Sequence, residues 1–153
     1  MTNVAQVLNE KMHQAIYTIR PDSTVLEAIT LMADKGIGAL VVTHEDNVVG
    51  ILSERDYTRK IALMQRTSFD TTVNEIMTSK VITVNTSTTV EDCLALMTER
   101  HLRHLPVVED EKLLGLISIG DLVKAAMDDQ RKLIEQLQQY ISLGDISSIK
   151  RKL

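Results

Sequence analysis

The chain of 153 residues aligns with itself, without a gap, when it is shifted by 65 positions. Between positions 8 and 61, 13 of 54 residues are identical to their shifted partners, and most other pairs are conservative. Chance would give about 6–7% identity at ordinary residue frequencies. A repeat constrains the fold strongly, because both copies must form the same structure. We expect repeat one over residues 4–66, repeat two over 69–127, and an extension over 128–153.

Each copy carries the same succession of patterns. A short apolar strand is followed by a polar turn and by a helix whose apolar residues recur at helical spacing. Two β-rich runs then flank an acidic turn, typical of an antiparallel hairpin, and Ser53 or Ser118 opens a second helix. The sequence therefore predicts a mixed α/β (α+β) fold of two β-α-β-β-α units. The expected strands are 16–19, 39–43 and 48–52 in repeat one, and 81–84, 105–108 and 113–117 in repeat two.

A unit of about 60 residues buries only a marginal core by itself. Two equivalent units are expected to pack their apolar sheet faces together about a pseudo-twofold axis. This arrangement leaves two equivalent clefts between the repeats, and clefts between domains are where small ligands usually bind.

Composition argues against several classes of function. Aromatic residues make up only 3% of the chain, and the net charge is −4, so neither base-stacking platforms nor attraction to nucleic acid is expected. The four histidines lack metal-ligand spacing, and no Gly-rich phosphate loop occurs. The only cysteine, Cys93, falls on the apolar face of a predicted helix and is interpreted as a core residue. No pair of nucleophile and base stands out, so we predict neither an enzyme nor a metal site.

No membrane or targeting segment is predicted. The longest apolar runs, such as 39–42, are far shorter than the roughly 20 residues that cross a bilayer. The N-terminus mixes polar residues into every turn and does not read as a signal peptide. We therefore expect a cytoplasmic protein.

The motifs, in their order and constant register, resemble a tandem pair of cystathionine-β-synthase (CBS) domains, or Bateman module. Each repeat carries a Gly-φ-φ-Ser-x-x-Asp element, where φ is apolar: residues 50–56 in repeat one and 115–121 in repeat two. The resemblance covers about residues 4–127 and implies a stand-alone CBS domain protein. It implies a regulatory module that binds AMP, ATP, NAD or NADH in the clefts, senses energy or redox state, and signals through conformation or assembly.

The Ser-x-x-Asp elements have two compatible interpretations. By spacing alone, each predicts a capping box, in which Ser caps a helix and Asp complements the helix dipole. A carboxylate also suits a vicinal diol, because its two oxygens can accept two hydrogen bonds. The resemblance implies the second role, in which Asp56 and Asp121 each accept hydrogen bonds from ribose hydroxyls.

The resemblance also implies two sites, each built from both repeats. The apolar members would enclose an adenine, although the same residues serve equally well as core. Arg103 and His104 are placed by the sequence at the cleft of Asp56. There Arg103 is interpreted as a phosphate ligand, the alternatives being a solvated loop end or an ion pair with Glu99, and the role of His104 stays open. The expected sets are Asp121, Ser118 and Leu116 with Met12, Tyr17 and Ile37, and Asp56, Ser53 and Ile51 with Met77, Ile82 and Leu102.

Residues 122–143 predict one long helix that ends at Gly144. Its apolar stripe has no counterpart in repeat one, which favours packing against a second subunit; the alternative is packing on its own module. We expect a homodimer and an unidentified effector protein as partners. Two other functions stay open: a dimerising scaffold with vestigial sites, and, less favoured, an enzyme that uses the same cleft. The stripe comprises Ala126, Leu133, Ile134, Leu137, Tyr140 and Ile141.

Overall fold

The computed structural model describes residues 1–11 and 15–152, with side chains up to residue 144. It confirms the mixed α/β fold of two repeats followed by a long helix. In repeat one the elements are α1 (Val4–Glu10), β1 (Thr18–Ile19), α2 (Val25–Lys35), β2 (Ala39–His44), β3 (Asn47–Ser53), α3 (Glu54–Tyr57) and the π-helical turn η1 (Thr58–Ala62). In repeat two they are α4 (Val73–Ile76), α5 (Val90–Arg100), β4 (His104–Glu109), β5 (Lys112–Ser118) and α6 (Ile119–Lys152).

The hairpins are the best matched parts of the two repeats. β2 and β3 pair antiparallel, as do β4 and β5, and each hairpin carries one register shift at the same place. The two central turn residues of each hairpin have positive φ, as type I′ turns require. These residues are Glu45 and Asp46 in the first hairpin and Asp110 and Glu111 in the second.

The opening strands are shorter than expected. β1 spans only Thr18–Ile19, where it pairs parallel with β2. In repeat two, the expected strand over 81–84 is reduced to one parallel bridge between Val84 and Val107. Both segments lie at a sheet edge, with a neighbour on one side only, and short edge strands are a common way to end a sheet.

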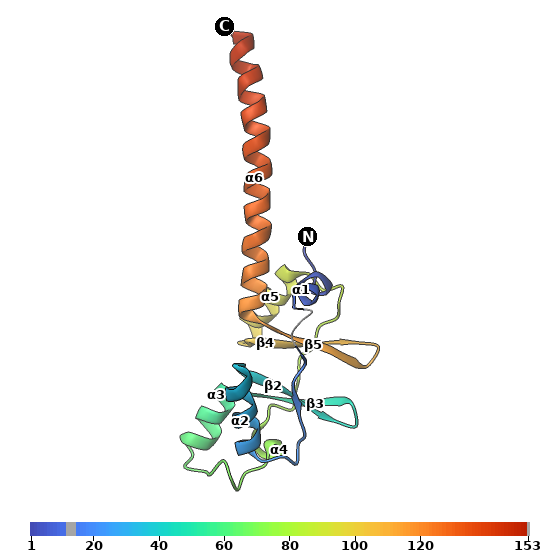
Figure 1. The fold of residues 1–153 in the computed structure, drawn as a ribbon, viewed down its shortest axis with the longest axis vertical. Coiled ribbons are helices and arrows are strands. Elements are labelled where there is room, and N and C mark those ends of the chain that lie inside the picture. The colour runs from blue at the N-terminus through green and yellow to red at the C-terminus, as the bar shows by residue number, and fades with distance from the viewer. Residues whose placement is uncertain (12–14, 153) are drawn as a thin grey trace.

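The opening helix of each repeat packs into the core of the other repeat. Val4 and Val7 of α1 are buried against α5, β4, β5 and α6. Val73 and Ile76 of α4 are buried against α2, β2 and β3. The molecule therefore consists of a first half, built on β1–β3 and completed by α4, and a second half, built on β4–β5 and completed by α1. Figure 1 shows these halves stacked, with α1 beside α5 in the second.

The helix α6 begins where Ser118 was expected to open a helix, and it differs from the expected one at its C-terminal end. It begins directly after Ser118, and it continues past Gly144 to Lys152. An isolated glycine costs a helix interior only about 1 kcal/mol, so it does not by itself end one. A glycine ends a helix when it adopts a left-handed conformation, as Gly36 does after α2 with φ of 64°.

The long helix leaves the body of the molecule after about three turns (Figure 1). Leu122 and Ala125 are buried in the second half, whereas every side chain from Gln130 to Gly144 is exposed. Ala126, the first residue of the stripe, packs against the core of the second half. From Leu133 onward the stripe is exposed and is not packed on its own module, which contradicts that alternative for this part of the helix. None of the helices in the described part of the chain combines the length and the apolar character needed to cross a membrane.

Candidate functional site

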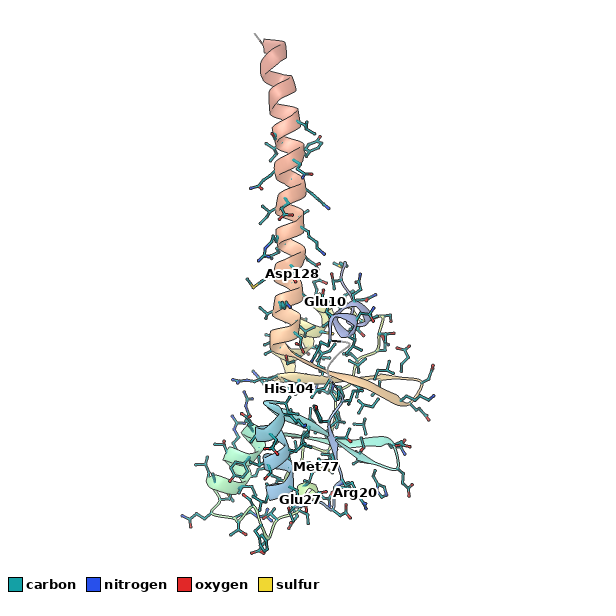
Figure 2. The ribbon with its side chains drawn as sticks, viewed as in Figure 1. Glu10, Arg20, Glu27, Met77, His104 and Asp128 are labelled. Carbon is teal, nitrogen blue, oxygen red and sulfur yellow. The ribbon has the colours of Figure 1, made fainter. Side chains whose placement is uncertain are left out.

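A cavity of about 720 Å³ lies between the two halves. The first half contributes the segment before β1, the end of α2 and the loop that follows it. The second half contributes the end of α1, the end of β5 and the start of α6. Figure 2 shows His104, one of its lining residues, at the level where the halves meet. The lining residues are Leu8, Lys11, Ala15, Ile16, Tyr17, Lys35, Gly36, Ile37, Gly38, Ala39, His104, Leu114, Gly115, Leu116, Ser118 and Asp121.

Five of the six residues expected around Asp121 line this cavity. Asp121, Ser118 and Leu116 come from the end of β5 and the start of α6. Tyr17 and Ile37 face them from the first half, where both also pack against its core. The sixth expected residue, Met12, lies outside the described residues.

Asp121 takes part in a reciprocal cap at the start of α6. Its Oδ2 accepts a hydrogen bond from the Ser118 backbone N–H at 2.9 Å, and its own N–H donates to Ser118 Oγ at 3.2 Å. Oδ2 also accepts from Lys11 Nζ at 2.7 Å. Burial raises the pKa of Asp121, but the hydrogen bonds from Lys11 and Ser118 outweigh it and hold the pKa below its ordinary value. The carboxylate is therefore ionised at neutral pH.

Two lysines give the cavity a cationic side that sequence reasoning missed. Lys11, at the end of α1, donates to Leu116 O at 2.9 Å as well as to Asp121. Lys35 lies over the ring of Tyr17, with Nζ 5.3 Å from the ring centroid. Only the exchange of α1 into the second half brings Lys11 to this place. Because a lysine near a helix end is usually a solvated cation, nothing in the sequence alone separates Lys11 from the other lysines.

His104 belongs to the cavity of Asp121, and its expected place at the cleft of Asp56 is wrong. The antiparallel register pairs His104 with Ser118, which sets it beside the end of β5. Across the cavity, a Cβ added to Gly38 would lie 3.8 Å from His104 Cε1. Burial and, next, the Lys11 ammonium lower the pKa of His104, against the raising effect of Asp121.

Arg103 is exposed and is not among the residues that line the cavity. With Lys11 and Lys35 on its walls, the cleft of Asp121 is also more cationic than the sequence predicted. The sequence had predicted the cationic character for the cleft of Asp56, because Arg103 and His104 were expected there.

In the Ser-x-x-Asp element of repeat one, the carboxylate is already bonded to other groups of the chain. Ser53 and Asp56 make a full capping box at the start of α3. Asp56 accepts hydrogen bonds from the N–H and hydroxyl of Ser53 and, at 3.4 Å, from Thr78 Oγ1. Lys60 Nζ lies 3.2 Å from the same carboxylate, whose side chain is 13% exposed. Beside it, Ile51 exchanges two backbone hydrogen bonds with Thr78. The donors on this carboxylate all come from the chain itself.

The residues expected to face Asp56 have other surroundings. Met77 packs against Gly50 and lines a shallower hollow of about 450 Å³, together with residues that include Val49 and Asn74. Figure 2 places Met77 in the first half. Ile82 and Leu102 are partly buried against the core of the second half. The structure gathers Asp56, Ser53 and Ile51 at the end of β3, with Met77 and Thr78 beside them.

Residues suited to metal binding do not gather where the side chains are described. Across residues 1–11 and 15–144, no group of three or more His, Cys, Asp or Glu side chains could hold a metal ion. Cys93 is buried in the second half. Burial, with a smaller effect of Asp92, raises the pKa of its thiol to about 11. The thiol is therefore protonated at neutral pH and suits a core position.

The duplicated α/β unit, with a cavity between its copies, defines a tandem-repeat module. The family model of the CBS domain matches residues 4–63 and 73–128. The chain belongs to the CBS domain family and contains two tandem CBS domains, the arrangement known as a Bateman module.

Relatives of known sequence or structure agree. The chain is 41% identical over 128 residues to the mitochondrial CBS domain-containing protein CBSX3 of Arabidopsis thaliana, covering 80% of this chain and 62% of that protein. A solved structure of a protein with CBS domains from Burkholderia ambifaria is 52% identical with a TM-score of 0.80, covering 84% of this chain and 96% of that one. The hexameric CBS-CP12 protein from bloom-forming cyanobacteria is 32% identical with a TM-score of 0.71, covering 79% and 66%.

Proposed function

We propose that this chain is a regulatory module that binds a phosphorylated adenosine in the cavity of Asp121. CBS domain pairs generally bind adenosine ligands for regulation. The observation that carries the proposal is the ionised Asp121 carboxylate on the wall of a cavity of about 720 Å³, a size typical of small-ligand sites. AMP, ATP, NAD and NADH all share the adenosine and phosphate groups that such a site recognises.

Each wall of the cavity suits one part of the ligand. Asp121 can accept hydrogen bonds from the two ribose hydroxyls, since a carboxylate has two acceptor oxygens. Among the described residues, none donates a hydrogen bond to its Oδ1. Tyr17, Ile37 and Leu116 offer apolar surface to an adenine ring. The Lys35 ammonium supplies positive charge for a phosphate.

We also propose that the two Ser-x-x-Asp elements differ in occupancy. Asp56 already accepts hydrogen bonds from Ser53 and Thr78 and pairs with Lys60. A ligand there must displace these donors, so the cleft of Asp121 is the tighter site. The output is a change in conformation or assembly that an effector protein reads, and catalysis has no part in it. The cytoplasmic location stays a prediction from the sequence.

Calorimetric titration with AMP tests the proposal. Asp121→Asn replaces one charged acceptor by an amide, and losing such a hydrogen bond weakens binding about ten- to a hundredfold. Asp56→Asn is the matched control, for which we expect a change of less than about threefold at the tighter site. A wild-type chain that binds none of AMP, ATP, NAD or NADH, or an Asp121→Asn variant with unchanged affinity, contradicts the proposal. The dimerising-scaffold alternative predicts that first result.

A further inference from the structure

Lys11 occupies the carboxylate that the proposed function assigns to a ribose. Its Nζ donates to Asp121 Oδ2 at 2.7 Å and to Leu116 O at 2.9 Å. The Lys11 and Asp121 side chains are 22% and 25% exposed, so solvent only partly screens the pair. Both residues line the same cavity. A ligand that approaches Asp121 with its hydroxyl groups therefore meets an ammonium that already holds this oxygen.

We propose that Lys11 determines specificity for phosphorylated ligands, by holding Asp121 in the empty pocket and moving to the phosphate of the bound nucleotide. This inference rests on the proposed function of the Asp121 cavity. A neutral nucleoside gains both carboxylate oxygens only by displacing the ammonium from Oδ2, and it returns no charge to Lys11. A nucleotide displaces the same ammonium and supplies a new anionic partner for it.

The geometry of the cavity supports this exchange of partners. Lys11 has a long, flexible side chain anchored on the last turn of α1, on the wall of a cavity with room for a whole nucleotide. Lys35, on the opposite half, adds a second positive charge to the walls. His104 beside them is held neutral by burial and by the Lys11 ammonium. The cations available to a phosphate within the described lining are thus the two lysines.

The arrangement is particular to one cleft and does not follow from the repeat. The residue equivalent to Lys11 in repeat two is Ile76, which is buried in the first half. At the other Asp, the ammonium comes from Lys60, which donates to Ile76 O at 2.8 Å. Lys60 is 43% exposed and follows Asp56 by four residues on the same helical segment, so both partners of this ion pair come from one repeat.

Two titrations of the Lys11→Met variant, with adenosine and with AMP, test the inference. Methionine preserves the length and apolar stem of lysine and removes the charge. Without the competing ammonium, adenosine binds about two- to fivefold more tightly, in the range of a partly exposed ion pair. The ratio of AMP affinity to adenosine affinity falls about ten- to a hundredfold, because the phosphate loses a charged hydrogen bond. Lys11→Gln repeats the test with a polar side chain, and thermal melting without ligand checks that both variants fold.

Two other lysines serve as controls. Lys35→Met lowers AMP affinity and does not raise adenosine affinity, because Lys35 does not hold Asp121. Lys60→Met leaves both affinities at the cavity of Asp121 unchanged. The inference is overturned if Lys11→Met and Lys11→Gln leave adenosine affinity unchanged or lower it, or leave the AMP-to-adenosine ratio unchanged. A wild-type chain that binds AMP through Asp121 keeps the proposed function in either case, whereas a wild-type chain that binds neither compound contradicts both.

Discussion

Ser118 and Asp121 show how one pair of side chains can begin a helix and also line a cavity. The backbone N–H groups at a helix start need acceptors, and the pair satisfies two of them reciprocally. The Asp121 carboxylate that results is ionised, oriented and only partly buried. One geometry therefore allows both the capping role and the proposed ligand-binding role of Ser-x-x-Asp. At Asp56 the chain itself supplies the further donors that a ligand would otherwise supply.

The titration of His104 is expected to report on the charge around it. Its lowered pKa places the midpoint of an NMR titration below the ordinary value of about 6.5. Lys11→Met should move this midpoint upward, because the Lys11 ammonium is one of the groups that lower it. An unchanged midpoint in Lys11→Met would show that the two side chains are not close in solution.

The same histidine predicts how stability depends on pH. As pH falls through about 6.5, the unfolded chain binds a proton before the folded chain does. The free energy of unfolding therefore falls with pH until the folded His104 is protonated as well. Urea denaturation at several pH values between 7.5 and 5 measures the effect, and His104→Gln should reduce this part of the pH dependence. An identical dependence in the variant would assign it to other groups.

At the scale of elements, the hairpins and helix starts follow from local sequence, whereas the short edge strands do not. Ser53 caps α3 where the sequence predicted a capping box, and Thr24 and Thr89 cap α2 and α5 with their own side chains. The end of α6 is different: Gly144 is typical of a helix end in the sequence, but the helix continues through it to Lys152. The cavity residues that belong to local motifs could likewise be predicted from the sequence. Lys11 could not, because it reaches the cavity only through the exchange of α1.

The two equivalent glycines of β3 and β5 make room for the exchanged segments, to different degrees. A Cβ on Gly50 would collide with the Met77 side chain and lie 3.2 Å from the backbone oxygen of Thr78. A Cβ on Gly115 would meet only the flexible end of Leu8, at 2.8 Å. We expect Gly50→Ala to lower the free energy of unfolding by about 1–3 kcal/mol and Gly115→Ala by less than about 1 kcal/mol.

Chemical denaturation of both alanine variants checks this order. Adding Met77→Ala to Gly50→Ala should restore part of the lost stability, measured as a coupling free energy in a double-mutant cycle. Equal losses at the two glycines, or strictly additive effects of Gly50→Ala and Met77→Ala, would show that the close approach of Met77 is not the cause.

At the scale of the whole molecule, contacts within a single chain do not explain why the exposed part of α6 carries apolar side chains. Leu133, Ile134 and Leu137 are each about half exposed, and Tyr140 is 77% exposed. Ala126, Leu133 and Tyr140 are spaced by seven residues, as are Met127, Ile134 and Ile141, the period of helices that pair along a seam. We propose a homodimer in which this stripe contacts a second copy; a CBS-CP12 relative forms hexamers.

Sedimentation of a double variant tests the dimer. Leu133→Asp with Leu137→Asp places two charges in the seam and should shift the dimer towards monomer at micromolar concentration. Gln139→Asp with Ser142→Asp adds the same charge on other faces of the helix and should leave the dimer intact. A wild-type monomer contradicts the homodimer, and an intact dimer in the leucine variant contradicts the role of α6.

The exchange of opening helices also sets the order in which the molecule can be completed during synthesis. α1 leaves the ribosome before the elements that bury Val4 and Val7, which are α5, β4, β5 and α6. The first half, by contrast, lacks only α4 and can close once residue 76 has emerged. The apolar face of α1 therefore stays uncovered until residues 90–125 have been made, which leaves it available to chaperones during that interval.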